Sequence, residues 1–416
     1  RLKKINERTP LPRWVGELYL EVHRGTYTSQ AKTKLGNRKC ELLLRELEIW
    51  ASLAQVVGHH EYPESEVQRL WRLVLLNQFH DTLPGSSIGD VYVDAERHYA
   101  EVLRVGSGLL DQALTALLDA LFSLYPRKRV KRAEDDSEIW VASFNSLGWT
   151  RGAEAVDVSN SEGIATYPDL FQDDEILQED SDCPKSVALL PAGTLAGIGI
   201  EPACLAKPQH LTELLTESES GFVLRSSYLT AEISRRGQLT SLRAGPADTR
   251  EDVLGIDFIA KHAPGNVIVT HDDTPLFWDA WDTEYFAYEK SVAPREVEVE
   301  CRVVERGPVR ASLRFDFAVG RSSRMTQWIS ITPLSRRLEF TSRVHWRESR
   351  KILRVQFPVN VRSGRAAYET QFGFLERNTH WNTSWDNAKF EVCAHRYCDL
   401  SQHGLGVALL NDSKYG

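Results

Sequence analysis

The feature that most constrains the fold is a change of hydrophobic period near residue 125. Before it, apolar residues recur at spacings of three and four, whereas alternating or β-branched runs dominate after it. The first spacing is typical of amphipathic helices and the second of strands. The sequence therefore predicts an α+β protein with several domains, in which a three-helix bundle precedes antiparallel β-sandwich domains.

Three segments carry the helical period. Residues 37–57 predict one helix, and residues 64–80 predict a second, which a Pro-Gly turn interrupts. Ser87 can cap a third helix, because Asp90 occupies the capping-box position three residues later. We expect the apolar stripe of this third helix to consist of Ile88, Val91, Ala95, Tyr99, Val102 and Leu103.

The same changes of pattern predict the domain boundaries. Residues 1–125 hold the helical domain, and residues 126–137 pass from basic to acidic, as solvated linkers often do. A small β domain is expected at 138–220 and a β-sandwich domain at 221–416. The expected strands are 139–144, 153–158, 228–233, 239–242, 297–304, 311–317, 338–346 and 353–359.

Composition limits the classes of partner. A net charge of −8 gives no reason to expect nucleic acid or an anionic membrane surface, and no run reaches the roughly 18 to 20 apolar residues of a membrane span. The six cysteines contain no CxxC pair, so we expect no disulfide framework or thiolate metal site, and a reducing compartment. The chain starts at Arg1 and ends just after a strand-like run, so we expect both ends to be cut.

The segment 75–87, LLNQFHDTLPGSS, is the best candidate for a functional site. A neutral imidazole is a common zinc ligand, and the C-terminal end of a helix tolerates a cation, so His80 is a candidate metal ligand. On a continuous helix Asp81 lies about 100° round from His80, which predicts that the two face neighbouring parts of one pocket without forming a dyad. The alternatives are a core histidine bonded to the backbone and an aspartate that stabilises the turn.

Asp279 and Asp282 are the closest candidates within the sequence for a pair of catalytic carboxylates. Trp278 and Trp281 flank them and could stack on the face of a sugar. The alternative is a loop that buried tryptophans anchor, and the sequence favours neither interpretation.

Three further groups have weaker cases. His59 and His60 follow a glycine and are expected to be exposed loop residues. Arg24 or Tyr27 could shape the wall of a site, but an ordinary ion pair or a packing role explains either residue as well.

Segments in order along nearly the whole chain resemble the cytosolic and vacuolar branch of class II α-mannosidases, glycoside hydrolase family 38. The histidine-aspartate segment, QFHD followed by PGSS, resembles that family's motif. The other matching segments are residues 13–30 (RWVGELYLEVHRGTYTSQ), 37–38 (NR), 275–282 (PLFWDAWD), 368–373 (YETQFG), 380–386 (HWNTSWD) and 409–416 (LLNDSKYG).

The resemblance implies that a catalytic α/β domain precedes this chain and that its last part lies within residues 1–125. A divalent metal, Zn²⁺ or Co²⁺, would be bound by a His and two Asp residues of that domain and by His80, while Asp81 would contact the bound mannose. The two ions are not separated by this ligand set. The nucleophile and the acid/base carboxylate of the retaining mechanism would lie upstream of Arg1, so this fragment holds no catalytic residue.

The resemblance further implies an α-mannosidase that removes terminal α-linked mannose from free oligosaccharides or glycans derived from N-glycans. Its partner would be a mannose-containing oligosaccharide, with Trp281 and Asp282 as additional candidates for substrate contact. The expected location is the cytoplasm, with the vacuole or lysosome as the alternative, and a homo-oligomer is left open. The rival class is a non-catalytic carbohydrate-binding or structural module, which predicts no metal requirement.

Overall fold

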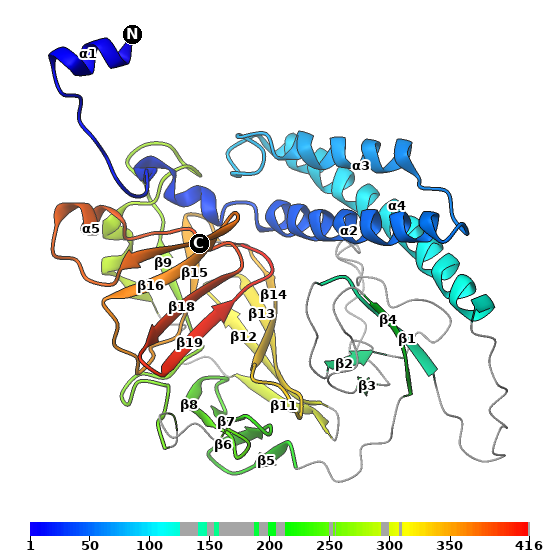
Figure 1. Cartoon of the computed structure of the whole chain (residues 1–416). Helices are drawn as coiled ribbons and strands as arrows, with labels where there is room; N and C mark the ends of the chain where they lie inside the picture. The colour runs from blue at the N-terminus through cyan, green and yellow to red at the C-terminus, as the bar shows by residue number, and fades with distance from the viewer. Residues whose placement is uncertain are drawn as a thin grey trace.

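The computed structural model describes residues 1–124, 140–147, 154–157, 187–190, 199–204, 213–248, 253, 255–292, 299–307 and 310–414. Within these ranges, the long helices come first and antiparallel sheets follow (Figure 1), which confirms the expected α+β class. The predicted linker at 126–137 lies outside the described residues.

The helical region contains three long helices, which are α2 (Ala31–Val56), α3 (Glu64–Asn77) and α4 (Gly89–Leu124). Helix α2 begins earlier than residue 37, α3 ends before residue 80, and α4 begins at Gly89. The shorter elements are α1 (Leu2–Arg8), the 3-10 helices η1 (Glu21–Tyr27) and η3 (Tyr285–Glu289), and α5 (Ser384–Ala388).

The three long helices pack around one apolar core, as a bundle requires. Leu44 and Leu47 of α2 and Leu70 of α3 belong to this core, together with Tyr99 of α4, and all four are fully buried. Gly36 lets the ring of Tyr99 lie against α2, because a Cβ at that position would stand 2.7 Å from the ring. Burial of this stripe, which the periodicity of three and four predicts, stabilises the bundle.

The strands form antiparallel sheets. One four-stranded sheet has the order β5 (Leu215–Glu217), β6 (Gly221–Arg225), β7 (Leu229–Ser234), β8 (Leu239–Ala244). A second has the order β11 (Glu300–Arg306), β12 (Ala311–Val319), β13 (Ser323–Ile331), β14 (Glu339–His345). A third has the order β17 (Gly373–Asn378), β16 (Arg365–Thr370), β18 (Tyr397–Gln402), β19 (Leu405–Leu410). Smaller sheets join β10 (Ser291–Val292), β9 (Val267–Asp272) and β15 (Lys351–Gln356), then β1 (Trp140–Asn145) with β4 (Gly199–Cys204), and β2 (Glu154–Asp157) with β3 (Val187–Leu190).

The first two four-stranded sheets share one core and make the expected sandwich. Leu224 and Ile233 of one sheet cluster with Leu313 and Phe315 of the other, and all four side chains are buried. Successive residues of a strand face opposite sides of its sheet, which explains this burial of alternate positions. The first of these sheets starts with β5, on the N-terminal side of the boundary predicted at 221.

Polar contacts join the helical bundle to the last sheet. Arg38 of α2 donates to the backbone carbonyl and the side-chain oxygen of Asn411, at 2.9 and 2.8 Å, and Lys39 pairs with Asp412 at 2.8 Å. The segment after β19 is therefore fixed on the first half of α2. Across the described residues, each helix is too short or too polar to cross a membrane.

Candidate functional site

His80 and Asp81 lie in a turn that follows α3. The helix ends at Asn77, and backbone hydrogen bonds then close successive turns, from Thr82 N to Phe79 O at 2.9 Å and from Gly85 N to Thr82 O at 3.1 Å. We call residues 78–87 the His80 turn. Gly85 has a φ of +93°, a conformation that side chains with a Cβ rarely adopt, so the glycine fits this position.

The imidazole of His80 and the carboxylate of Asp81 are neighbours in space. Nε2 of His80 lies 3.6 Å from Oδ2 of Asp81, which corrects the separation expected on a continuous helix. The reason is that α3 has already ended, so the 100° step between helical residues does not apply. The side chain of His80 is 74% exposed and that of Asp81 is 44% exposed, so the core-histidine interpretation is wrong.

Three side chains fix the backbone of Asp81. The hydroxyls of Ser86 and Ser87 donate to its carbonyl at 3.3 and 2.7 Å, and the Tyr92 hydroxyl lies 3.4 Å from the same oxygen. Ser87 was expected to cap α4 with this hydroxyl, but the hydroxyl bonds to Asp81 instead, and its backbone N–H donates to Tyr92 at 2.7 Å. These contacts fix the backbone of Asp81, whose carboxylate lies 3.6 Å from Nε2 of His80.

The His80 turn and the Trp278 loop, residues 273–284, both contact the short segment Gly25–Ser29. Gly25 of this segment lies so close to Asp282 that a Cβ at residue 25 would stand 3.0 Å from the Asp282 carbonyl oxygen. Ser29 bonds through its hydroxyl to the carbonyl of Ala280 at 3.2 Å, and its atoms touch Gly85. The structure thereby brings the two predicted parts of the site to the same segment.

The side chains of the Trp278 loop have different environments. Trp278 is 70% exposed, whereas Trp281 is half-buried with its ring 5.0 Å from the ring of His23, edge to face. Trp278 and Ala280 have positive φ values of 63° and 67°, a strained conformation for residues other than glycine. Of the two tryptophans, Trp281 anchors the loop and Trp278 is presented to solvent.

Asp282 pairs with Arg24. The two side chains lie 3.2 Å apart and are largely buried, and Arg24 also donates to the carbonyl of Ala388 at 2.8 Å. The Phe390 ring lies 4.5 Å from the guanidinium. The ion-pair interpretation of Arg24 is therefore correct, while contact of Trp281 or Asp282 with substrate stays a prediction.

Asp273, at the start of the same loop, was not identified from the sequence. Burial raises the pKa of its carboxyl group, and the charge of Asp279 raises it further. Its Oδ1 is buried and has no hydrogen-bond partner among the described residues. A raised pKa favours the protonated acid, which can donate a hydrogen bond.

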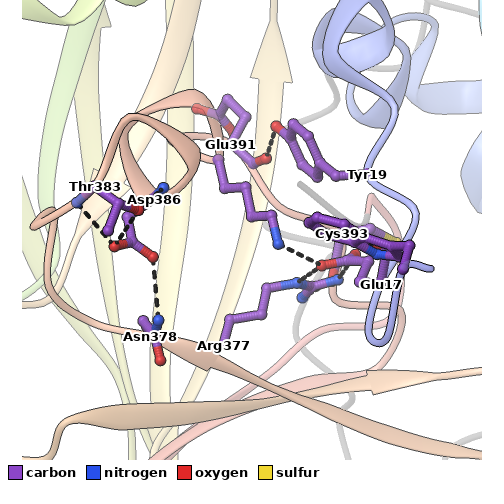
Figure 2. Close-up of polar contacts among 10 residues, drawn as sticks. Glu17, Tyr19, Arg377, Asn378, Thr383, Asp386, Glu391 and Cys393 are labelled. Carbon is purple, nitrogen blue, oxygen red and sulfur yellow. Dashed lines mark hydrogen bonds and ion pairs between the residues drawn. The ribbon is translucent and has the colours of Figure 1, made fainter. Parts of the chain in front are cut away.

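The segment that precedes η1 is held against the last sheet (Figure 2). The carboxylate of Glu17 accepts two hydrogen bonds from Arg377 of β17, and the hydroxyl of Tyr19 donates to the carbonyl of Glu391 at 2.5 Å. The bonds from Arg377 hold the pKa of Glu17 below its usual range, against the effect of burial. Arg377 also donates to the carbonyl of Cys393 at 3.0 Å, so this contact joins three segments of the chain.

His59 and His60 lie between α2 and α3, outside the His80 turn. His59 is exposed as expected, but His60 is half-buried and its Nε2 has no hydrogen-bond partner among the described residues. Both line a depression of about 530 Å³ together with Asp111 and Asp119 of α4.

No group of three or more His, Cys, Asp or Glu side chains within the described part of the chain is arranged to hold a metal ion. His80 offers an accessible imidazole 3.6 Å from the Asp81 carboxylate, and its role as a metal ligand stays a prediction. Four cysteines, Cys40, Cys301, Cys393 and Cys398, are free thiols.

Comparisons with known proteins match most of the chain. The family model described as "Alpha mannosidase middle domain" matches residues 21–117, and "Glycosyl hydrolases family 38 C-terminal domain" matches residues 224–416. Human "Alpha-mannosidase 2C1" is 36% identical over 407 residues, and the Saccharomyces cerevisiae protein "Alpha-mannosidase" is 32% identical over 428 residues. These alignments cover 97% and 100% of this chain but 35% and 33% of the relatives, so the chain spans about a third of their length.

A solved structure has the same fold. The crystal structure of an α-mannosidase from Enterococcus faecalis V583 superposes with a TM-score of 0.72 at 17% sequence identity. The superposition covers 99% of this chain and 53% of that one.

Proposed function

Because the chain belongs to glycosyl hydrolase family 38 and carries its middle and C-terminal domains, we propose that it is the part of an α-mannosidase that completes the active site from outside the catalytic domain. The whole enzyme would remove terminal α-linked mannose from free oligosaccharides and from glycans derived from N-glycans, a catabolic reaction. The names of the curated relatives support the activity.

The observation that carries the proposal is the exposed pair of His80 and Asp81, 3.6 Å apart on a turn whose backbone is fixed. Large apolar side chains close to this pair in the sequence are also exposed. They are Leu75, Leu76, Phe79 and Ile88. The Phe79 ring lies 4.3 Å from the His80 ring. Apolar groups clustered around polar ones on a surface are typical of an interaction site. We assign as its occupant the catalytic domain of the same enzyme, since the relatives are about three times as long as this chain.

The side chains present fit one part of a metal site. The His80 imidazole is accessible and can serve as one ligand, and the Asp81 carboxylate beside it favours a cation nearby. The remaining ligands would come from the catalytic domain. When bound, a divalent ion, Zn²⁺ or Co²⁺, would supply positive charge that orients the hydroxyls of the sugar. Asp81, fixed through its backbone, would accept a hydrogen bond from the same mannose.

Retention of configuration requires a nucleophilic carboxylate and a second one that acts as acid and then as base. In this chain the carboxylate of Asp282 is engaged by Arg24, and Asp279 is exposed on the Trp278 loop. In line with the family resemblance, we propose that both catalytic carboxylates lie in the catalytic domain. We also propose a cytoplasmic location.

The test is hydrolysis of 4-nitrophenyl α-mannoside by the full-length protein, with the β-mannoside as the matched control. We expect hydrolysis of the α anomer alone, with α-mannose as the first product in a proton NMR time course, and loss of activity after treatment with a chelator. A protein that binds mannosides without cleaving them would instead support a carbohydrate-binding module.

A further inference from the structure

Lys34 is a buried cation between the two parts of the proposed site. It lies in the first turn of α2, and its residue is 1% exposed. Its ammonium donates to the carbonyl of Ser29 at 2.5 Å, of Leu83 at 2.8 Å and of Pro84 at 3.4 Å. An ammonium has three N–H donors, so these three carbonyls can use them all.

These carbonyls belong to two segments, and the proposed site depends on the position of one segment relative to the other. Leu83 and Pro84 belong to the His80 turn, while Ser29 ends the segment Gly25–Ser29, which the Trp278 loop contacts. Ser29 donates through its hydroxyl to Ala280 at 3.2 Å, and the N–H of Gly25 donates to the carbonyl of Trp281 at 2.9 Å. One side chain therefore connects both parts of the site without contacting either His80 or Asp81.

The fit of the turn against Ser29 is close. A Cβ at Gly85 would stand 2.6 Å from the Cβ of Ser29 and 2.8 Å from its carbonyl oxygen, so the backbone of the turn lies directly on this residue. The contact of Gly85 with Ser29 and the hydrogen bond of Lys34 to Pro84 involve adjacent residues of the turn.

A lysine is a costly way to fill this space. Burial, together with the nearby charge of Lys414, lowers the pKa of Lys34 to about 7. Methionine would occupy a similar volume without the cost of removing an ammonium from water. The presence of a lysine at this buried position is explained if its hydrogen bonds hold together two segments that apolar packing alone would leave free to shift.

We propose that Lys34 is a positioning residue of the active site. Its ammonium fixes the His80 turn against the segment Gly25–Ser29, so that the imidazole, the carboxylate and the Trp278 loop face the same bound sugar. This inference rests on the proposed function for its effect on catalysis, whereas its effect on the turn does not depend on that function.

The test compares Lys34→Met with Lys32→Met, a substitution of an exposed lysine on the same helix, in the full-length protein. Hydrogen exchange measured by mass spectrometry should be several-fold faster in Lys34→Met for peptides that cover residues 78–88, with exchange in α4 beyond residue 100 unchanged. We expect kcat/KM on 4-nitrophenyl α-mannoside and metal affinity each to fall by about 10- to 100-fold, as for other residues that orient a ligand. Lys32→Met should match the native protein.

Gly85→Ala serves as the second variant, because it displaces the same turn while leaving Lys34 in place. If Lys34→Met does not fold, local acceleration of exchange over residues 78–88 in Gly85→Ala, with the same loss of metal affinity, supports the proposal. A folded Lys34→Met variant with native exchange in the turn and kcat/KM within twofold would overturn it, as would exchange that rises equally throughout the bundle. Absence of hydrolysis by the native protein would refute the proposed function alone, because the exchange measurement still tests the role of Lys34 in the turn.

Discussion

Glu17 and Arg377 form a two-bond ion pair between the N-terminal segment and strand β17. The two hydrogen bonds measure 2.7 and 3.0 Å, and the side chains are 19% and 8% exposed (Figure 2). Two parallel hydrogen bonds between a guanidinium and a carboxylate stabilise the contact and also fix the relative orientation of the two side chains. The pair fixes the segment that leads to Arg24, whose guanidinium holds Asp282 of the Trp278 loop.

Loss of either partner should destabilise this contact. We expect Glu17→Gln and Arg377→Met each to lower the free energy of unfolding by about 2 to 4 kcal/mol, because each leaves a largely buried charge without its partner. Urea denaturation of the two single variants and the double variant gives the coupling energy. The exposed pair of Arg365 and Glu376, with side chains 68% and 52% exposed, is the control and should couple by less than about 1 kcal/mol. Equal coupling in the two pairs would contradict this account.

The contribution of Glu17 should depend on pH. Its pKa is lowered from 4.5 by the hydrogen bonds of Arg377, so the folded state binds its proton less tightly than the unfolded state does. The stabilisation is complete above about pH 4.5 and is lost as pH falls through the folded pKa. The difference in Tm between the native protein and Glu17→Gln should therefore be constant from pH 7 to pH 5.5 and shrink toward pH 3.5. A constant difference over the whole range would disprove the assignment.

Two glycines in the helical region should respond to alanine with opposite signs. Gly85→Ala should destabilise the protein by about 1 to 3 kcal/mol, because the residue has a φ of +93° and its Cβ would meet Ser29. Gly108 lies within α4, where a Cβ meets nothing within 4 Å, so Gly108→Ala should stabilise by up to about 1 kcal/mol. Thermal unfolding of both variants checks the pair, and a lower Tm for Gly108→Ala would show that the helix there depends on more than propensity.

The sequence predicts the parts of the fold that local periodicity specifies. The bundle and strands such as β7 and β12 were expected, because their buried positions are mostly apolar. Strand β13 was missed, although its positions alternate in burial, because polar residues occupy two of its five inward positions, Ser323 and Gln327. Gln327 bonds to the buried amide of Asn266 at 2.6 Å. Strands β16–β19 are half-exposed and give little contrast between their faces.

The candidate site depends on contacts that local patterns do not contain. A good helix former, Gln78, follows Asn77, but it donates to Asn37 at 3.0 Å and to Glu41 at 2.7 Å on α2, at the point where α3 ends. The burial of Lys34 could not be predicted either, because charged residues on a helix usually face water. The pair of Arg24 and Asp282 joins residues 258 positions apart.

The most direct test of the central claim is the metal content and hydrolytic activity of His80→Ala in the full-length protein. His59→Ala is the matched control, since His59 is also exposed and lies outside the His80 turn. We predict that His80→Ala loses both the bound metal and the hydrolysis of 4-nitrophenyl α-mannoside, while His59→Ala retains both. Native metal content and native activity in His80→Ala would contradict the assignment of His80 to the site.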